Sequence, residues 1–288
     1  MKNRNVHQRV ESIYNDLTRS ERKIADLVLA RPEDVIKMTA SELAEESDTS
    51  PASVIRFCKS IGIPSFPELK LALSAERKSE IPNHYSDILP TEKLSDVKAK
   101  LLGNAYQSME ETIQLIDDNV IVDAINLIEK APFVYVFGVG SSFLVAENIA
   151  QKWNRIGKVC ICLSDVHLLI SSLASAAPGT VFIGISNSGE TKEVLALNEV
   201  AKSSGIKTIG MTQFGMNTLS KQADVVIQTI KSKEGELRSA ATSSLMSQFI
   251  TIDLLFYAYV LGNYDEHISS IHDSRQLVDE YKLRYDKK

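Results

Sequence analysis

The stretch that decides the fold is Ser186-Asn187-Ser188-Gly189-Glu190-Thr191. It follows an apolar run, Val181 to Ile185, and precedes a helical pattern that begins near Lys192. The first N–H groups of a helix lack partners within the helix and carry the positive end of its dipole. Hydroxyl groups and a glycine at such a strand-to-helix turn therefore suit an anion such as phosphate. An ordinary polar turn with a serine cap has the same local pattern, so the stretch alone leaves both interpretations open.

Around this stretch, short apolar segments alternate with helical patterns over the second half of the chain. Five segments rich in β-branched residues are predicted to be strands: Phe133 to Val139, Val159 to Leu163, Thr180 to Ile185, Lys207 to Met211 and Asp224 to Thr229. Their apolar character without clean alternation is typical of a parallel sheet that is buried on both faces. Such sheets bind ligands beyond the carboxyl ends of their strands, where the stretch from Ser186 lies.

A second polar loop, Gly138-Val139-Gly140-Ser141-Ser142, follows the first predicted strand in the same way. It is not a dinucleotide-binding fingerprint, because Phe143 stands where the third glycine is needed. A glycine-rich turn with the glycine-lysine-hydroxyl sequence of a P-loop is also missing. The remaining chemistry is recognition of a small phosphate ester by hydroxyl groups at two neighbouring strand ends.

The first 78 residues read as consecutive short helices, each with its own start signal. Three capping boxes support this prediction, and they pair Thr18 with Glu21, Thr39 with Glu42 and Ser65 with Glu68. Ser50-Pro51 marks a further helix start, because serine caps a helix and proline is favoured at its first position. We therefore predict an all-α domain over residues 1–78, a linker over 79–92 and an α/β domain with flanking helices over 93–288.

Two of these helices, Ala40 to Ser47 and Pro51 to Ile61, are separated by about three residues, which is the spacing of a helix-turn-helix. Helical periodicity places Val54, Phe57 and Ile61 in the core. The predicted DNA contacts are Ser50, Ala52, Ser53, Arg56, Lys59 and Lys70. A plain helical bundle, in which Arg56 and Lys59 merely face solvent, has the same spacing and stays open as an alternative.

Composition limits the classes of function. The chain has 288 residues, 44% of them hydrophobic, and a formal net charge of -5, which argues against coating nucleic acid by bulk electrostatics. We find no uninterrupted apolar run long enough to span a bilayer and no signal-peptide pattern, which predicts a cytoplasmic protein without a membrane partner. Three cysteines, Cys58, Cys160 and Cys162, show no metal-ligand spacing and are predicted to be buried thiols. No metal or cofactor is expected.

Taken together, these motifs resemble the RpiR family of bacterial transcriptional regulators, which join an N-terminal helix-turn-helix domain to a sugar isomerase (SIS) domain. The resemblance covers nearly the whole chain. Its N-terminal motifs are Leu17-Thr18, Ser20-Glu21, Ile24-Ala25, Glu42-Leu43-Ala44, Val54 to Lys59, Gly62 and Leu69-Lys70. Its C-terminal motifs are Gly138 to Ser142, Ser186 to Thr191, Arg238-Ser239 and the apolar helix from Phe249 to Leu261.

The resemblance implies a winged-helix or homeodomain-like N-terminal domain and a flavodoxin-like, five-stranded parallel sheet in the SIS domain. It also implies the ligand-binding residues, which are Gly140, Ser141, Ser142, Ser186, Asn187, Ser188, Thr191 and Glu236. Asn187 stands where SIS enzymes carry glutamine, and Ser243 stands where they carry a lysine, which weakens a catalytic role for Glu236. Glu236 then accepts hydrogen bonds from sugar hydroxyls, or is a solvated loop carboxylate.

Two further residues are weaker candidates for this pocket. His167 follows the second predicted strand and could contact a sugar hydroxyl, although a structural histidine fits the sequence as well. Lys152 lies on the helix after the first polar loop, where a cation could strengthen phosphate binding or simply face solvent.

Three functions are compatible with these features. The favoured one is a regulator that binds double-stranded operator DNA as a homodimer or homotetramer, has no catalytic residues and senses a phosphorylated sugar. A phosphosugar isomerase or lyase that uses Glu236 is the main alternative. The third is a DNA-independent interaction module. The capped helical domain with a basic second half favours the regulator, because an isomerase has no use for it.

Overall fold

A computed structural model describes residues 6–76, 91–231 and 242–285 of the chain. These residues form two compact units. The first contains helices up to residue 115 together with residues 214–216 and 230–231, and the second contains the sheet and the helices around it. Most of the linker expected at 79–92 lies outside the described residues, so the domain boundaries 1–78, 79–92 and 93–288 stay a prediction.

The first unit is entirely helical, as predicted. Its elements are α1 (Val6–Ile13), a 3-10 helix η1 (Tyr14–Asp16), α2 (Arg19–Ala30), α3 (Pro32–Lys37), α4 (Ala40–Glu46), α5 (Pro51–Ser60), α6 (Phe66–Glu76) and α7 (Leu94–Leu115). The capping boxes at Thr18 and Thr39 both form. Ile24, Leu43, Phe57 and Leu69 from four different helices are fully buried, and they give α1 to α6 one common core.

The second unit is a doubly wound α/β fold. Its strands are β1 (Val134–Gly138), β2 (Cys160–Cys162), β3 (Val181–Ile185), β4 (Lys207–Gln213) and β5 (Val225–Thr229). All four pairings are parallel, in the order β2-β1-β3-β4-β5. This is the flavodoxin-like strand order, and it confirms both the predicted strands and the predicted fold.

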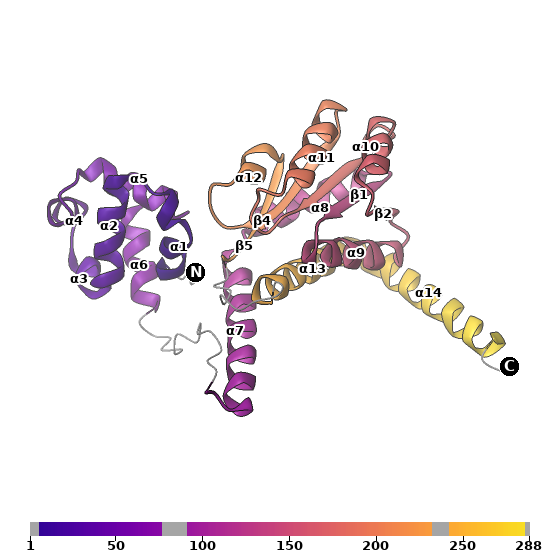
Figure 1. Ribbon diagram of the computed structural model, residues 1–288, viewed down its shortest axis with the longest axis horizontal. Helices are drawn as coiled ribbons and strands as arrows, with labels where there is room; N and C mark the ends of the chain where they lie inside the picture. Colours follow the sequence, from indigo (N-terminus) through magenta and orange to yellow (C-terminus); the bar gives the residue numbers. More distant parts are fainter. Residues whose placement is uncertain (1–5, 77–90, 232–241, 286–288) are drawn as a thin grey trace. The chain divides into compact units, whose positions relative to one another are not determined.

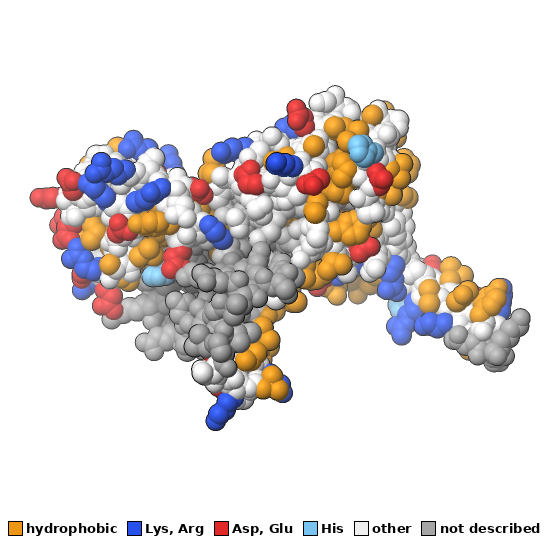
Figure 2. Space-filling view, in the orientation of Figure 1, with side chains coloured by type: hydrophobic (Ala, Val, Ile, Leu, Met, Phe, Trp, Pro, Cys, Tyr) orange, Lys and Arg blue, Asp and Glu red, His pale blue; other side chains and the backbone are white. Residues whose placement is uncertain are grey.

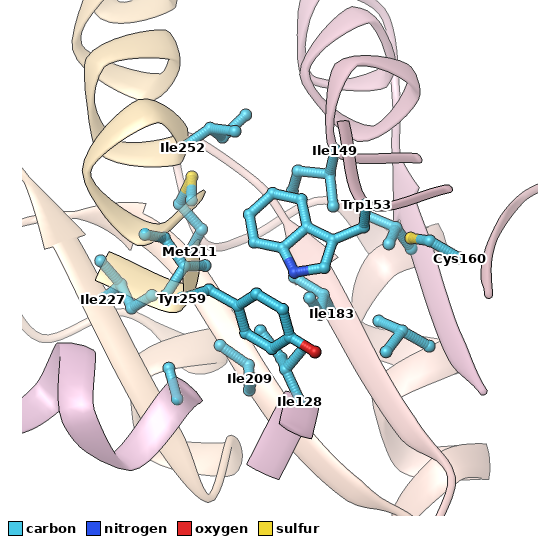
Figure 3. Close-up of a cluster of buried hydrophobic side chains, with 14 of the residues drawn as sticks. Ile128, Ile149, Trp153, Cys160, Ile183, Ile209, Met211, Ile227, Ile252 and Tyr259 are labelled. Carbon is cyan, nitrogen blue, oxygen red and sulfur yellow. The ribbon is translucent and has the colours of Figure 1, made fainter. Parts of the chain in front are cut away.

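Helices cover both faces of this sheet (Figure 1). One face packs against α8 (Asp118–Lys130), α9 (Ser141–Asn154) and α13 (Ser243–Gly262). The other packs against α10 (Val166–Ala174), α11 (Lys192–Ser203) and α12 (Thr218–Gln222). On the first face, Trp153 lies among Ile149, Ile183 and Tyr259 (Figure 3). Strands buried on both sides explain why the sequence shows apolar runs instead of alternation.

Helix α13 is the one helix of the described residues that is long and apolar enough to cross a membrane by length and composition. Its apolar run is interrupted by polar residues such as Ser247 and Gln248, so it does not stand out as an uninterrupted apolar segment in the sequence. Its residues Ile252, Leu255 and Tyr259 belong to the buried core of the sheet unit. The helix therefore has the position of a core helix, not of a membrane span.

Helix α14 (Tyr264–Tyr285) continues the chain from α13 and runs out from the body of the sheet unit (Figure 1). None of its residues is buried. Ile268 and Ile271 in its first half pack against the core of the unit, whereas Leu277, Val278 and Tyr281 in its second half are exposed.

Candidate functional site

Two loops meet at the point where the strand order of the sheet reverses. β1 and β3 are neighbours, and the chain continues outward from them in opposite directions to β2 and β4. Gly138 pairs with Ile185 in the parallel register, so the two strands end at the same level. The polar loops that follow them therefore start side by side at the switch point, where doubly wound sheets bind their ligands.

The first loop leads from β1 into α9 through Gly140, whose backbone conformation favours glycine. Gly140 is the residue before the helix and has a φ of +60°, which side chains rarely adopt. Having no side chain, it cannot cap the helix. Ser141 is half-buried and Ser142 is buried, and neither hydroxyl has a hydrogen-bond partner among the described residues. The start of α9 thus offers free N–H and hydroxyl groups.

The second loop is organised by the hydroxyl of Ser186. This side chain is only 1% exposed. Its Oγ accepts hydrogen bonds from the backbone N–H of Gly189 at 3.1 Å and of Thr191 at 3.4 Å, and it lies 2.8 Å from the hydroxyl of Thr191. Ser186 therefore shapes the turn from within and satisfies the N–H groups that an anion would otherwise contact.

The more accessible hydroxyls of this loop belong to Ser188 and Thr191. Ser188 is exposed, and its Oγ accepts a hydrogen bond of 3.2 Å from the N–H of Glu190. Thr191 is half-buried and precedes α11 without capping it by its side chain. These two hydroxyls are placed to donate to a bound anion, with Ser186 behind them.

Glu190 received no role from the sequence, yet it fixes the loop to α12. Its carboxylate accepts hydrogen bonds from the N–H of Thr218 at 2.8 Å and from the Thr218 hydroxyl at 2.7 Å. These bonds hold the pKa of Glu190 below its ordinary value. The alignment of a carboxylate with the first turn of a helix 28 residues away could not be read from local spacing.

Gly189 and Asn187 complete the loop. Gly189 has a φ of +70°, and a Cβ added there would lie 2.0 Å from Oδ1 of Asn217. The backbone carbonyl of Asn187 accepts a hydrogen bond of 3.0 Å from the N–H of Gln213 at the end of β4. The side-chain oxygen of Asn187 is buried and has no hydrogen-bond partner among the described residues. The loop is thus held on both sides and leaves one polar atom unsatisfied.

Capping distinguishes the two helices at this edge from other helices of the sheet unit. Helices α8, α10 and α12 begin with side-chain caps from Asp117, Asp165 and Asn217. Helices α9 and α11 have no side-chain cap, and both begin at the switch point. Helix α13 also lacks a cap, but its start adjoins residues that the structure does not describe. Two neighbouring helix dipoles therefore point open N-termini at one place.

Three further residues were considered from the sequence, and the structure describes two of them. Lys152 forms an ion pair with Asp253 and lies over the Phe256 ring, at the opposite end of α9 from Ser141. Its proposed proximity to phosphate is wrong, because eleven residues of helix span about 16 Å. His167 is exposed on the first turn of α10. Glu236 lies outside the described residues, as do Arg238 and Ser239.

The first unit contains the predicted helix-turn-helix. Helices α4 and α5 are joined by residues 47–50, where the backbone N–H of Thr49 donates to the carbonyl of Ala44 at 2.8 Å. Asp48 has a φ of +48° and forms an ion pair with Lys23 of α2, which lowers the pKa of its carboxyl. The Oγ of Ser50 accepts a hydrogen bond of 3.3 Å from the N–H of Ser53, so Ser50 caps α5 as predicted.

The placement of Ser53 needs correction. The helical spacing predicts that it faces outward, but its side chain is only 4% exposed. Its Oγ lies 3.0 Å from that of Ser50 and accepts a hydrogen bond of 3.0 Å from Nη2 of Arg56. Ser53 therefore holds the exposed Arg56 in place from beneath the outer surface. Helical periodicity could not reveal this, because a serine at the edge of the buried face is compatible with either the buried or the exposed side.

Lys70, predicted to contact DNA, also makes contacts within the helical unit. Its ammonium group donates a hydrogen bond of 2.9 Å to the carbonyl of Met38 and lies 5.9 Å from the centre of the Phe66 ring. It links α6 to the end of α3. Ala52 and Lys59 are exposed on α5, as predicted, and they share their face with Arg56 and with Ile55. Figure 2 shows basic side chains over the part of the helical unit where Figure 1 places α5.

Comparison with known proteins agrees with this two-part organisation. The model of the rpiR-family helix-turn-helix domain matches residues 4–80, and the model of the SIS domain matches residues 127–258. An HTH-type transcriptional regulator of Bacillus subtilis, YbbH, is 37% identical over 96% of this chain and 97% of its own length. The chain belongs to the RpiR family. It is a transcriptional regulator with a helix-turn-helix and a SIS domain.

Other relatives of this RpiR regulator extend the comparison. An HTH-type regulator of Haemophilus influenzae is 31% identical over 98% of this chain and 99% of its own. Among solved structures, Vibrio vulnificus NanR complexed with ManNAc-6P is 26% identical, with a TM-score of 0.60 over 96% of this chain and 99% of that one. The sugar isomerase domain of an RpiR transcription factor from Sphaerobacter thermophilus is 20% identical with a TM-score of 0.56, and it shows the fold alone.

Proposed function

We propose that this RpiR regulator senses a phosphorylated sugar at the switch point of its SIS domain and binds operator DNA through α5. The observation that carries the proposal is the pair of uncapped helix N-termini, α9 and α11, at the ends of two neighbouring strands. The relative whose structure covers nearly the whole chain, Vibrio vulnificus NanR, was solved with ManNAc-6P. A phosphorylated sugar is therefore the class of effector that we assign.

In this proposal, the phosphate of the effector replaces serine hydroxyls as the acceptor of backbone hydrogen bonds. In the described loop, Ser186 and Ser188 accept hydrogen bonds from the backbone N–H groups of Gly189, Glu190 and Thr191. A phosphate oxygen is a stronger acceptor than a hydroxyl, because hydrogen bonds to ionised groups are shorter and stronger. On binding, the N–H groups turn to the phosphate, and the hydroxyls change from acceptors to donors.

The remaining predicted ligands have defined places in this proposal. Ser141 and Ser142 donate from the start of α9, and Gly140 allows the close approach of the backbone to the phosphate. Asn187 keeps its buried side-chain oxygen as an acceptor for a sugar hydroxyl. Glu236, which is not among the described residues, is also proposed as an acceptor for a sugar hydroxyl.

For DNA binding, we assign α5 as the recognition helix in the major groove. Ala52, near its start, permits close approach, while Arg56 and Lys59 contact the DNA. Ser53 orients Arg56, and Ser50 caps the helix. Lys70 supports the position of α6 against α3 and contributes positive charge.

We further propose that the regulator is a dimer, whose two α5 helices read half-sites roughly 34 Å apart or a multiple of this. The exposed apolar stripe of α14 supports this proposal. Leu277, Val278 and Tyr281 are exposed, and Val278 lies seven residues after Ile271, on the face through which Ile271 packs on the body of the same chain. Figure 2 shows hydrophobic side chains along this helix. Asp279 pairs with Lys282 within the helix, whereas antiparallel pairing with a second copy would bring Glu280 of one helix toward Arg284 of the other.

The test is a thermal-shift panel of hexose, amino-sugar, muramic and pentose phosphates, each beside its unphosphorylated sugar. A true effector raises the melting temperature in proportion to the logarithm of its concentration once it is in excess. Ser141→Ala combined with Ser188→Ala should abolish the shift. Ser203→Ala is the matched control, because this serine lies at the far end of α11 and bonds only within its helix. A shift that survives the double variant means that the phosphate site is elsewhere, and turnover of a phosphosugar at enzyme-like rates would favour the isomerase alternative.

A further inference from the structure

We propose that Ile55 determines part of the operator sequence by contacting the methyl group of a thymine in the major groove. This inference rests on the proposed role of α5 as the recognition helix. It assigns a base-reading role to an apolar residue that the sequence analysis left without a role.

The exposure of Ile55 separates it from the other apolar residues of its helix. Val54, Phe57 and Cys58 are each 0% exposed, whereas Ile55 is 38% exposed. Leu71 on α6 is the other large apolar side chain among residues 6–76 with comparable exposure. The burial of its neighbours shows that α5 is firmly packed, so Ile55 is presented outward by a rigid helix and not by a frayed end.

The position of Ile55 on the helix matches that of the proposed DNA contacts. At 100° per residue, Ile55 lies about 60° to one side of Ala52, Arg56 about 40° to the other side and Lys59 close to the centre. All four therefore share one face. The hydrogen bond from Arg56 to Ser53 fixes the edge of this face that lies opposite Ile55. A β-branched side chain on a helix has essentially one rotamer, so Ile55 offers a preformed apolar surface.

Only one base presents an apolar group to such a surface. In the major groove, thymine carries a C5-methyl group, while the other bases present donors and acceptors at their accessible edges. An isoleucine placed against those polar atoms would remove their water without replacing its hydrogen bonds. The pairing therefore favours thymine by attraction and disfavours other bases by desolvation.

The experiment uses the full-length protein and an operator selected from a pool of random DNA duplexes. Each thymine of the selected site is then replaced in turn by deoxyuridine, which removes the methyl group and nothing else. The loss of one buried methyl group weakens binding by roughly fourfold per half-site. We expect one thymine per half-site at which the wild-type protein shows this loss and Ile55→Ala shows none, which is the signature of direct coupling in a double-mutant cycle.

Matched variants keep the result interpretable. Leu71→Ala removes the other exposed apolar side chain, on α6, and should leave the deoxyuridine effect intact. Ile55→Val keeps the β-branched shape and should retain most of it, with an unchanged melting temperature. If no thymine responds to deoxyuridine, or if Ile55→Ala keeps the full response, the inference is overturned. If Arg56→Ala still weakens operator binding when the role of Ile55 is overturned, the assignment of α5 as the recognition helix is kept. If no DNA site is selected at all, both the role of Ile55 and the assignment of α5 are contradicted.

Discussion

The hydroxyl of Ser186 lies 2.8 Å from the hydroxyl of Thr191, across the turn between β3 and α11. The two side chains differ in what surrounds them, because Ser186 is buried while Thr191 is half-buried at the mouth of the turn. One hydroxyl therefore builds the loop, and the other is available to a ligand. Substitutions at the two positions should therefore have different effects on stability and on ligand binding.

Replacing Ser186 should cost stability as well as binding. Ser186→Ala removes the acceptor of the Thr191 N–H and one of the two acceptors of the Gly189 N–H, which keeps the backbone carbonyl of residue 186. An unsatisfied donor away from water costs about 1–3 kcal/mol. Ser188→Ala at the exposed neighbour should change the free energy of unfolding by less than about 0.5 kcal/mol. Urea denaturation of both variants measures the difference. Equal stability of the two would show that the buried network contributes nothing.

Gly189→Ala tests whether the tight turn is required. The substitution places a Cβ 2.0 Å from Oδ1 of Asn217 at a φ of +70°, so the loop must shift away from α12. Gly205→Ala is the control, because Gly205 has a similar φ of +73° but open space around its Cβ position. The control isolates the conformational cost, which is about 1 kcal/mol. We expect Gly189→Ala to lose at least twice as much stability in thermal unfolding; indistinguishable melting temperatures would refute the steric account.

Ser53→Ala tests whether Arg56 is held in place for DNA. Removing the 3.0 Å hydrogen bond frees the guanidinium, and a typical bond contributes about 1 kcal/mol, so operator affinity should fall roughly fivefold. Arg56→Ala should reduce affinity by more than this and also reduce the slope of log affinity against log salt if the arginine contacts a phosphate. Fluorescence anisotropy at several salt concentrations measures both. Unchanged affinity in Ser53→Ala would mean that Arg56 needs no support.

The sheet unit should lose stability in acid through Asp224. Burial raises the pKa of this carboxyl, but hydrogen bonds from the N–H and hydroxyl of Thr208 and the contact with Lys207 outweigh burial and lower the pKa below its ordinary value. A carboxyl with a lowered pKa stabilises the fold above its unfolded pKa, and this contribution disappears as pH falls through the folded value. Asp224→Asn should therefore unfold more easily than the wild type at pH 7, and the difference should shrink below about pH 4. A difference independent of pH would contradict this assignment.

The strands and both polar loops could be predicted because their signals are local. β-branched runs such as Val181 to Ile185 mark buried strands, and hydroxyls before helical patterns mark the turns. Contacts between distant segments could not be predicted this way. Lys152 pairs with Asp253, which lies 101 residues away, and no spacing within α9 indicates it.

Helical periodicity also assigns faces only coarsely. It placed Val54 and Phe57 correctly in the core, but Ser53 and Ile55 lie at the two borders between the buried and exposed faces of α5. There, packing decides exposure, and the polar residue is buried while the apolar one is exposed. The sequence did carry one signal for the exposure of Ile55: on a helical projection it lies about 60° from Ala52 and about 100° from Val54.

The most direct test of the central claim measures operator affinity with and without the phosphorylated sugar identified by thermal shift. Ligand and DNA must influence each other by the same factor if the SIS domain controls the helix-turn-helix. We predict at least a fivefold change in operator Kd for the wild-type protein. Ser141→Ala combined with Ser188→Ala should keep the ligand-free Kd and lose the change. An operator Kd that ignores the sugar phosphate in the wild type, or responds equally in the double variant, would contradict the account.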